Sequence, residues 1–343
     1  MTFADVLEIK NGRNQRAVED PNGKYPIYGS GGIMGYANDY ICDAETVIIG
    51  RKGNINKPIF VEEPFWNVDT AFGLAAKRDL LLPKYLYYFC LRYDFEKHNK
   101  TVTIPSLTKA DLLNINIELP NIEVQQSAID TLQKIEEVLN LRQQQLSALD
   151  NLIKARFVEM FGTFPSNEKG WPTGTIRDLV TEVRYGSSRK AAEGDSGKYP
   201  YLRMNNITYS GELDLSDTKT IDIPDEELDK CTVRRGDLLF NRTNSKELVG
   251  KTCVYNRDEL MVLAGFVVRV RLNEKALPEF VSAFMNTTFS KQMLLGMCKA
   301  AIGQANINAQ ELQNIGIYIP PIELQREFVS FKEQIDKSKF MKQ

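Results

Sequence analysis

Arginine and asparagine side chains gather in two stretches of the chain, each where a loop is expected to begin. Residues 203–206 (Arg-Met-Asn-Asn) follow a Tyr-Pro turn, and residues 241–246 (Asn-Arg-Thr-Asn-Ser-Lys) follow a short apolar run. Arginine can donate two hydrogen bonds to guanine, asparagine can pair with adenine, and lysine and small polar groups hold phosphates. Candidate contacts to duplex DNA in these stretches are Arg203, Asn205, Asn206, Arg242, Thr243, Asn244 and Lys246. The alternative, that Asn and Thr only form turns here, stays open for each residue.

Further polar segments extend this candidate set. A third loop in the second half contains Lys299, Gln304 and Asn306. In the first half the corresponding candidates are Ser30, Gly31, Arg51, Lys52, Asn54, Lys57, Lys100 and Thr103. Arg51 and Arg242 are the strongest individual candidates, because the internal repeat described below aligns them.

The rest of the composition excludes several kinds of chemistry. The chain has one histidine, His98, which we expect at the surface, and five scattered cysteines without a Cys-x-x-Cys pair. A zinc site and histidine-based nucleophilic catalysis are therefore not expected, and the cysteines are interpreted as free thiols. The glycine-rich stretch 29–35 lacks the spacing of a dinucleotide loop, and no phosphate-binding Walker loop occurs. We expect no cofactor and no metal in this chain.

The overall charge gives no general attraction to a polyanion. The chain carries 43 basic and 45 acidic residues, for a formal net charge of −2. Nucleic-acid binding would therefore depend on local clusters of cations. Apolar runs such as residues 261–268 are far shorter than the ~20 residues of a membrane helix. Asp5 and Glu8 soon after Met1 are not the pattern of an export signal, so we do not expect export. The expected location is the cytoplasm, without membrane association.

An internal duplication organises the elements that must position these loops. Residues 114–126 match residues 314–326, with seven identical pairs out of thirteen. Gly12 and Lys24-Tyr25-Pro26 likewise match Gly186 and Lys198-Tyr199-Pro200, and shorter matches in the same order lie between them. Such a series of ordered matches predicts two copies of one structural unit.

Each copy has the pattern of a mixed α and β domain. Short apolar runs at 46–49 and 237–240 predict buried strands, and proline-initiated segments at 83–97 and 278–298 predict helices. Alternating apolar residues at 115–119 and 315–319 predict a further strand in each copy, ending at a proline.

A long helix is expected after each proline. Residues 122–160 contain no glycine or proline, and apolar residues recur in heptads, which is typical of a coiled coil. The second helix begins similarly and is shorter. The predicted packing residues are Leu132, Leu139, Leu146, Leu149, Ile153, Leu324, Phe328, Phe331 and Ile335.

The order of these parts resembles the specificity subunits of type I restriction–modification enzymes. The resemblance rests on residues 117–126 and 317–326, on Lys198-Tyr199-Pro200-Tyr201-Leu202-Arg203, on residues 235–242 and on Trp171-Pro172. It implies an α+β protein with a pseudo-twofold internal repeat, in which two similar target-recognition domains are separated and followed by long coiled-coil helices. The implied divisions are 1–120 (first recognition domain), 121–162 (central helix), 163–320 (second recognition domain) and 321–343 (shortened C-terminal helix).

The resemblance also implies a function. Each recognition domain would read one half of a split, asymmetric site in double-stranded DNA, and the helices would dock two methyltransferase subunits. Methylation with S-adenosylmethionine and cleavage with ATP and magnesium would belong to the methyltransferase and restriction/translocase subunits, so the chain itself would not be an enzyme.

The short second helix departs from the family pattern. We expect it to leave Leu146, Leu149 and Ile153 exposed, covered by a methyltransferase subunit, or paired with a second copy through self-association. Three alternatives stay open: a protein-interaction scaffold, an inactive truncated subunit, and an enzyme that acts alone on DNA, against which the missing methyltransferase and Walker motifs argue.

Overall fold

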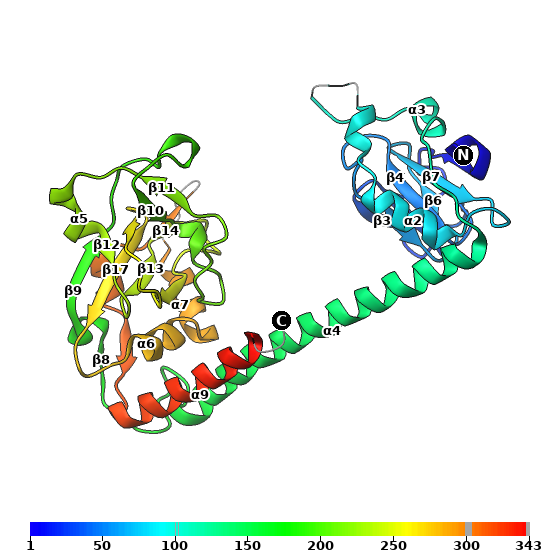
Figure 1. The fold of residues 1–343 in the computed structure, drawn as a ribbon. Helices are drawn as coiled ribbons and strands as arrows, with labels where there is room; N and C mark the ends of the chain where they lie inside the picture. The colour runs from blue at the N-terminus through cyan, green and yellow to red at the C-terminus, as the bar shows by residue number, and fades with distance from the viewer. Residues whose placement is uncertain (100, 102, 299–303, 341–343) are drawn as a thin grey trace. The chain divides into compact units, whose positions relative to one another are not determined.

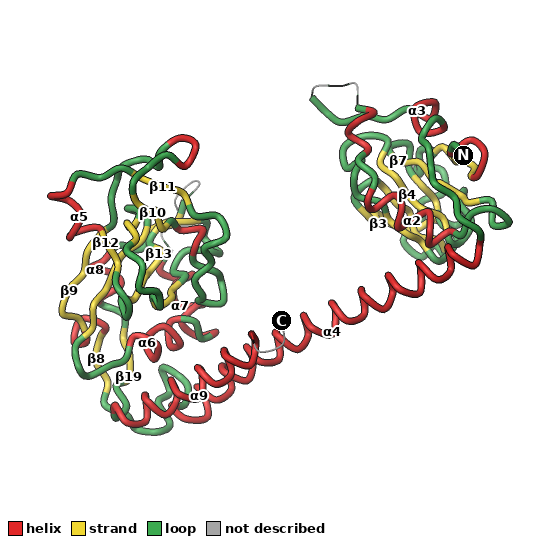
Figure 2. The backbone as a smooth tube through the Cα atoms, viewed as in Figure 1, coloured by secondary structure: helices red, strands yellow, loops and turns green. Residues whose placement is uncertain are grey.

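The computed structural model describes residues 1–99, 101, 103–298 and 304–340. The chain divides into two compact units, unit 1 (Met1–Arg142) and unit 2 (from Gln143 onward). Both units combine helices with sheets, as the ribbon and tube views show (Figures 1 and 2). The predicted α+β class is therefore confirmed.

Unit 1 contains two sheets and the first half of the longest helix. One sheet is antiparallel, in the order β1-β7-β4-β5, and the other has the order β3-β2-β6, with β2 and β6 parallel. The strands are β1 (Leu7–Asn11), β2 (Tyr25–Gly29), β3 (Gly32–Ala37), β4 (Thr46–Gly50), β5 (Ile59–Val61), β6 (Trp66–Asn67) and β7 (Ala71–Ala76). The helices are α1 (Phe3–Val6), α2 (Pro83–Arg92), α3 (Lys109–Leu113) and α4 (Ile122–Phe161), which continues into unit 2.

Unit 2 has the same plan with insertions. Its main sheets have the orders β15-β13-β17-β9 and β11-β10-β16-β12, and two strand pairs, β14-β18 and β19-β8, are added. The strands are β8 (Thr173–Thr175), β9 (Val180–Tyr185), β10 (Tyr199–Leu202), β11 (Lys219–Ile221), β12 (Thr232–Val233), β13 (Leu238–Asn241), β14 (Thr243–Asn244), β15 (Thr252–Val254), β16 (Met261–Leu263), β17 (Val267–Leu272), β18 (Ala305–Asn306) and β19 (Gly316–Tyr318). The helices are α5 (Asp225–Cys231), α6 (Pro278–Met285), α7 (Thr288–Met297), α8 (Ala309–Gln313) and α9 (Ile322–Phe340), with a 3-10 turn at Ile176–Leu179.

The duplication seen in the sequence is reproduced in strand order and direction. Strands β1, β7, β4 and β5 of unit 1 correspond to β9, β17, β13 and β15, and both units contain one parallel pair, β2-β6 and β10-β16. The matched glycines have one role in both copies. A Cβ atom on Gly12 would lie 1.8 Å from the Val68 carbonyl oxygen, and one on Gly186 would lie 2.2 Å from that of Leu263. Only glycine permits this backbone approach.

The glutamine in the repeated Ile-Glu-x-Gln segment also has an equivalent position in the two units. Gln125 and Gln325 are both fully buried. The side-chain oxygen of Gln325 accepts from the Leu277 N–H at 2.9 Å, and its amide donates to the carbonyls of Lys275 and Pro320. Gln125 makes the corresponding three bonds in unit 1. Each glutamine thus fixes a long helix to the loop that leads into α2 or α6.

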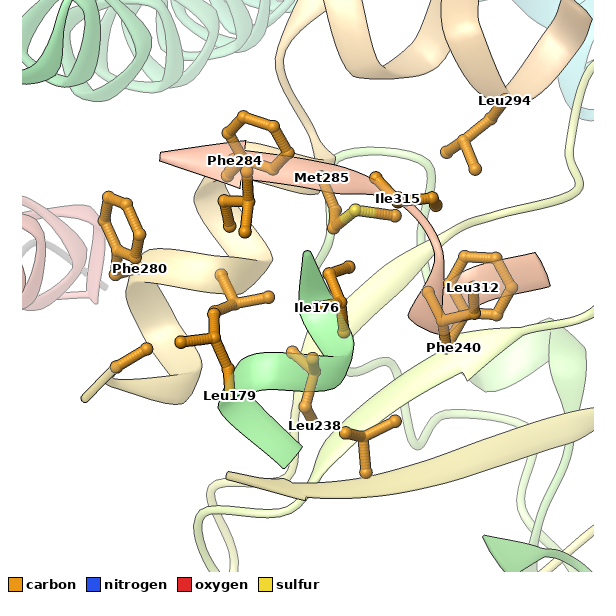
Figure 3. Packing of buried hydrophobic residues seen from close by; sticks show 14 of the residues in the cluster. Ile176, Leu179, Leu238, Phe240, Phe280, Phe284, Met285, Leu294, Leu312 and Ile315 are labelled. Carbon is orange, nitrogen blue, oxygen red and sulfur yellow. The ribbon is translucent and has the colours of Figure 1, made fainter. Parts of the chain in front are cut away.

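The core of unit 2 lies between its antiparallel sheet and its helices. Figure 3 shows side chains from the 3-10 turn, β13, α6, α7 and α8, together with Ile315 just before β19, pointing toward one another. At the helix pair, Phe157 and Phe161 of α4 pack edge-on against Phe328 of α9, with ring centroids 5.2 and 5.7 Å apart. The aromatic residues at this end of α4 therefore belong to the core of unit 2.

Helices α4 and α9 are antiparallel. Phe161 contacts Phe328, Arg156 pairs with Glu327 at 2.9 Å, and Asp150 pairs with Lys339 at 2.7 Å. The expectation that Leu146, Leu149 and Ile153 lack an in-chain partner is wrong for Ile153, which packs against the unit 2 core, and all three are partly buried. The exposed side chains lie instead in the first half of α4. Leu132 and Leu139 are 37 % and 63 % exposed, so the predicted packing there is not formed within unit 1.

The other predicted packing residues lie along the described part of α9. Phe328 is fully buried, whereas Leu324, Phe331 and Ile335 are partly buried. Phe331 lies beneath the Arg156 guanidinium, 5.8 Å from the ring centroid. Because α9 is antiparallel to α4, the start of α9 packs against the end of α4. This direction explains why the apolar residues at the end of α4 are covered and those in its first half are exposed.

Three local expectations need correction. The predicted helix at 278–298 is two helices, because Asn286 ends α6 and Thr287 caps α7. The alternating run at 115–119 is not a strand in unit 1, where the facing segment contributes only the Thr2–Asn116 bridge, whereas in unit 2 β8 pairs with β19. His98 is partly buried, and its Nε2 lies 2.7 Å from the Tyr93 hydroxyl.

Candidate nucleic-acid interface

Three candidate segments of unit 1 meet beside the end of β4. Ser30 and Gly31 form the two-residue turn of the β2–β3 hairpin, so the glycine-rich stretch 29–35 is part of a hairpin. The loop after β4 lies against this turn, since a Cβ atom on Gly31 would be 3.6 Å from the Asn54 amide nitrogen. Main-chain bonds from Gly53 to Pro105 and from Leu107 to Arg51 join the same loop to the segment that follows Thr103.

The cations of this cluster are available to a ligand. Arg51, Lys52, Asn54 and Lys57 are all exposed, as is Thr103. Arg51 lies over the Phe72 ring at 5.8 Å, and within the described residues its only recorded side-chain contact is this one. Lys100 lies outside the described residues. The turn, the loop and the Thr103 segment together present positive charge, amides and hydroxyls on one edge of unit 1.

In unit 2 the corresponding edge is built by a strand pair. Residues Thr243 and Asn244 form β14 directly after Arg242, and they pair with Asn306 and Ala305 of β18. The Arg242 carbonyl accepts a bond from the Ile307 N–H, which fixes the two segments together. The structure thereby brings two candidate loops, far apart in the sequence, to one place.

Arg242 is held in position by an aromatic ring. Its guanidinium lies 5.0 Å from the Tyr185 ring centroid, and one nitrogen is 3.5 Å from the Gly265 carbonyl. Its Nε is buried without a hydrogen-bond partner in the described part of the chain. Since stacking on an aromatic face leaves the in-plane donors of arginine free, this geometry suits recognition of a planar or anionic group.

Three other candidates of unit 2 make hydrogen bonds or an ion pair within the fold. Asn206 is 2 % exposed, and its side chain bonds to the Arg203 N–H and to the carbonyls of Asp214 and Asp217. Arg203 pairs with the Asp217 carboxylate at 2.9 Å. The Thr243 hydroxyl is largely buried and donates to Asn306 at 3.0 Å. We therefore assign Asn206 and Thr243 a structural role and remove them from the contact set, because their polar groups are already bonded within the fold. Arg203 is held by its ion pair with Asp217, although its Nε is buried without a hydrogen-bond partner in the described part of the chain, and we assign it a structural role on the strength of that pair.

The remaining candidates differ in exposure. Asn205, Lys246, Gln304 and Asn306 are exposed, whereas Asn244 is partly buried and accepts from the Ser245 N–H. Lys299 lies outside the described residues. The accessible edge of unit 2 is therefore formed by Arg242, Asn244, Lys246, Gln304 and Asn306, with Asn205 on a separate turn.

Sequence reasoning missed Tyr185 and the exposed apolar residues near these edges. Tyr185 ends β9, supports Arg242, and accepts a bond from the Ala309 N–H at 3.0 Å. Ile33 and Met34 follow the Ser30–Gly31 turn and are more than half exposed, as is Ile104 beside Thr103. The position of Tyr185 directly before the repeated Gly186 was the available signal, since glycine marks the end of that strand.

The structure offers little for other kinds of site. Within the described residues no group of three or more His, Cys, Asp or Glu side chains could hold a metal, and no helix is long and apolar enough to cross a membrane. All five cysteines are buried free thiols. Burial raises the pKa of Cys42 and of Cys253 to about 12, which makes both thiols poor nucleophiles.

A family model matches nearly all of the chain. The family is described as "Type I restriction modification DNA specificity domain", and the matched residues are 1–151 and 168–343. The chain belongs to this family. The two matches correspond to the two copies of the repeat, one in each part of the chain.

Curated relatives include specificity subunits of type I restriction enzymes. The EcoKI specificity subunit of Escherichia coli is 24 % identical over 83 % of this chain and 66 % of its own length. The StySPI specificity subunit of Salmonella potsdam is 20 % identical over 83 % of this chain and 65 % of its own length. The chain thus spans less than two thirds of the length of these relatives.

A solved structure has the same fold. The S subunit of a type I restriction–modification system from M. genitalium covers 99 % of this chain, and 89 % of the M. genitalium chain is covered in return. The TM-score is 0.56 and the sequence identity 15 %. This likeness supports the mixed fold with long helices.

Proposed function

We propose that this chain is the non-catalytic, sequence-specific DNA-binding subunit of a type I restriction–modification enzyme. In this proposal unit 1 reads one half of a split, asymmetric duplex site and unit 2 reads the other. The observation that carries the proposal is the equivalent position of Arg51 and Arg242, each directly after the matching strand β4 or β13, among accessible amides and lysines. The family assignment supports the same role.

The partner chains follow from the family. We propose that two methyltransferase subunits and a restriction/translocase subunit assemble with this chain, and that S-adenosylmethionine, ATP and magnesium act in those partners. The names of the relatives, specificity subunits of restriction enzymes, support an assembly of this kind. This chain would supply sequence recognition alone.

The first half of α4 is the proposed docking surface for a methyltransferase subunit. Leu132, Ile135, Val138 and Leu139 are each more than a third exposed, and Val138 and Leu139 are more than 60 % exposed. A contiguous set of exposed apolar side chains on a helix is typical of a protein interface. Self-association through the same surface is the competing outcome, and the mass of the purified complex distinguishes the two.

The decisive experiment is a comparison of host methylomes. Genomic DNA is sequenced for adenine methylation from cells that carry this chain, cells that lack it, and cells that carry Arg51→Ala or Arg242→Ala. We expect deletion to abolish methylation at one split, asymmetric motif. Each arginine variant should relax or lose one half of that motif and leave the other half unchanged.

Two controls make this experiment interpretable. Arg235→Ala removes an exposed arginine of unit 2 that is already paired with Asp258 at 2.7 Å, and it should leave the motif unchanged. An unchanged methylome on deletion would contradict the proposal and favour a scaffold or a silent subunit. Retention of both half-sites in Arg51→Ala and Arg242→Ala would instead refute only the proposed contacts.

A further inference from the structure

A cavity of about 450 Å³ in unit 2 gathers three lysines from separate elements. Lys154 comes from α4, Lys246 from the loop after β14, and Lys291 from α7. Glu247 is the single carboxylate among the lining residues, so the lining carries a surplus of two positive charges.

Lys291 is the unusual member of this set. Its ammonium group is buried and has no hydrogen-bond acceptor within the described residues. Among the described residues, its side chain contacts the face of Tyr209, 4.7 Å from the ring centroid. Burial, together with repulsion from Lys251 and Lys154, lowers the pKa of Lys291 to about 8. A buried cation without a counter-charge is costly, so an anion in the cavity would stabilise it.

The neighbouring Lys251 is bonded within the fold and is not available to bind a ligand. Lys251 is almost fully buried and donates to the Met204 carbonyl at 2.8 Å. It contributes positive potential to the cavity without occupying it. Lys251 and Lys154 thus add positive potential at Lys291, and Glu247 is the one carboxylate among the residues that line the cavity.

Asn286 provides a second unsatisfied group in the cavity lining. Its amide nitrogen donates to the carbonyls of Thr252 and Ser282, both at 2.8 Å. Its side-chain oxygen is buried and accepts no hydrogen bond from the described residues, so it could accept one from the hydroxyl of a protonated phosphate but not from a phosphate diester. The cavity also includes Thr288, at the start of the ten-residue helix α7, where main-chain N–H groups and the helix dipole favour an anion.

We propose that this cavity is a phosphate-binding site, with Lys291 as its central ligand and Lys154 and Lys246 at its rim. The phosphate group comes either from a free phosphate compound or from the DNA backbone. The second source is reasonable because Lys246 belongs to both the cavity and the DNA-contact edge. Only that source rests on the proposed function.

The first arm of the test uses inorganic phosphate without DNA. Isothermal titration calorimetry compares phosphate with sodium chloride at matched ionic strength, using the full chain. Saturable binding to the wild type, weakened at least tenfold in Lys291→Met, supports a free-phosphate site. Methionine keeps the unbranched stem and removes the charge. Lys154→Met changes an exposed residue at the rim of the cavity, and it takes the place of Lys291→Met in the titration if that variant does not fold.

The second arm measures duplex binding as a function of salt. A backbone phosphate in the cavity predicts that Lys291→Met reduces the slope of log affinity against log salt by about 1. Lys230→Met, an exposed lysine on α5 away from the cavity, should change neither arm. A lower slope without phosphate binding identifies the DNA backbone as the source.

The two proposals fail in different ways. If Lys291→Met equals the wild type both in phosphate affinity and in salt slope, the cavity proposal is overturned whether or not the chain binds DNA. If the wild type does not bind duplex DNA at all, the proposed function fails, and the phosphate titration alone then decides the cavity.

Discussion

The arginines of unit 2 differ in what holds their guanidinium groups. Arg189, Arg203 and Arg235 are paired with carboxylates within 3 Å, whereas Arg242 has a tyrosine ring and one carbonyl. A carboxylate competes directly with a phosphate or a base edge for the same donors, and an aromatic face does not. This difference explains why Arg242, rather than Arg189, Arg203 or Arg235, is the proposed contact.

Tyr185 should control DNA recognition through Arg242. Replacing Tyr185 with Ala removes the ring that orients the guanidinium, and we expect affinity for the half-site of unit 2 to fall by about 1 kcal/mol, roughly fivefold. Titration of labelled duplex carrying the identified motif measures the change. Tyr185→Phe is the matched control, because it keeps the ring and loses only the hydroxyl, with the bond that this accepts from the Ala309 N–H. Equal affinities for Tyr185→Ala and the wild type would show that the ring has no orienting role.

We expect Gln325 to be important for the stability of the fold and unimportant for DNA recognition. Gln325→Leu leaves a buried N–H and two carbonyls without their partner, and we expect the free energy of unfolding to fall by about 3 kcal/mol. Chemical denaturation measures the loss. Gln310→Leu on α8 alters an exposed glutamine and should cost less than about 0.5 kcal/mol. Equal stability of the two variants would contradict this role.

At the scale of elements, the last described turn of α9 is fixed to unit 2 by a charge cluster. The Lys339 ammonium lies 2.7 Å from Asp150 of α4, 2.8 Å from Asp336 and 3.3 Å from Glu212. Lys339 is 9 % exposed, so its charge is compensated almost entirely by these carboxylates. The cluster connects both helices with the loop around Glu212, and it complements the aromatic packing at Phe328.

Removing the central cation should loosen the helix pair. Lys339→Met leaves three carboxylates facing one another, and since all three are partly exposed we expect a loss of about 1–3 kcal/mol. Lys337→Met, two residues earlier on the exposed face, is the matched control. Hydrogen exchange of the α9 amides locates the change, and protection equal to that of the control would argue against the cluster.

The same cluster predicts sensitivity to acid. Burial raises the pKa of Asp336, but hydrogen bonds from Lys332 and Lys339 outweigh it and hold the pKa below its ordinary value. Because the folded-state pKa is depressed, this contribution is complete above about pH 4 and is lost as the pH falls through the folded-state value. The wild type should therefore lose more stability than Asp336→Asn between pH 5 and pH 2, as measured by thermal unfolding. Parallel losses would exclude this contribution.

At the scale of the whole molecule, the two units repeat one arrangement of strands and helices, and each unit has its own hydrophobic core. Each has an antiparallel sheet of the same order, a parallel strand pair, and a buried glutamine at the start of a long helix. The candidate loops follow the equivalent strands β4 and β13. In the proposed function, two similar units with different loop residues suit a split site whose halves differ in sequence.

If the two units bind their half-sites independently, as proposed, the losses of binding free energy caused by a change in each unit should add. The double variant Arg51→Ala with Arg242→Ala should lose binding free energy equal to the sum of the single losses, within about 0.5 kcal/mol, because the two sites share no contact partner. Gel-shift titration with an unmethylated duplex that carries the identified motif measures the affinity of all four proteins, namely the wild type, the two single variants and the double variant. A double variant no weaker than either single variant would mean that one unit carries all the binding.

The sequence by itself determined the repeat, the mixed class and the long helices. These features depend on local signals: prolines that start α2 and α6, the heptads of α4, and the paired segments around Gln125 and Gln325. It also placed Arg51 and Arg242 directly after strands, because a short apolar run followed by polar residues marks the end of a strand. Such signals act over a few residues and are readable without coordinates.

Only the tertiary structure decided which polar residues are accessible. Asn206 and Asn205 are neighbours of the same type, yet Asn206 is buried by bonds to Asp214 and Asp217 while Asn205 is exposed. The pairing of β14 with β18 joins segments sixty residues apart, and the antiparallel direction of α9 leaves Leu139 exposed rather than Ile153. Each outcome depends on contacts between distant residues, and the residue types and their spacing do not specify such contacts.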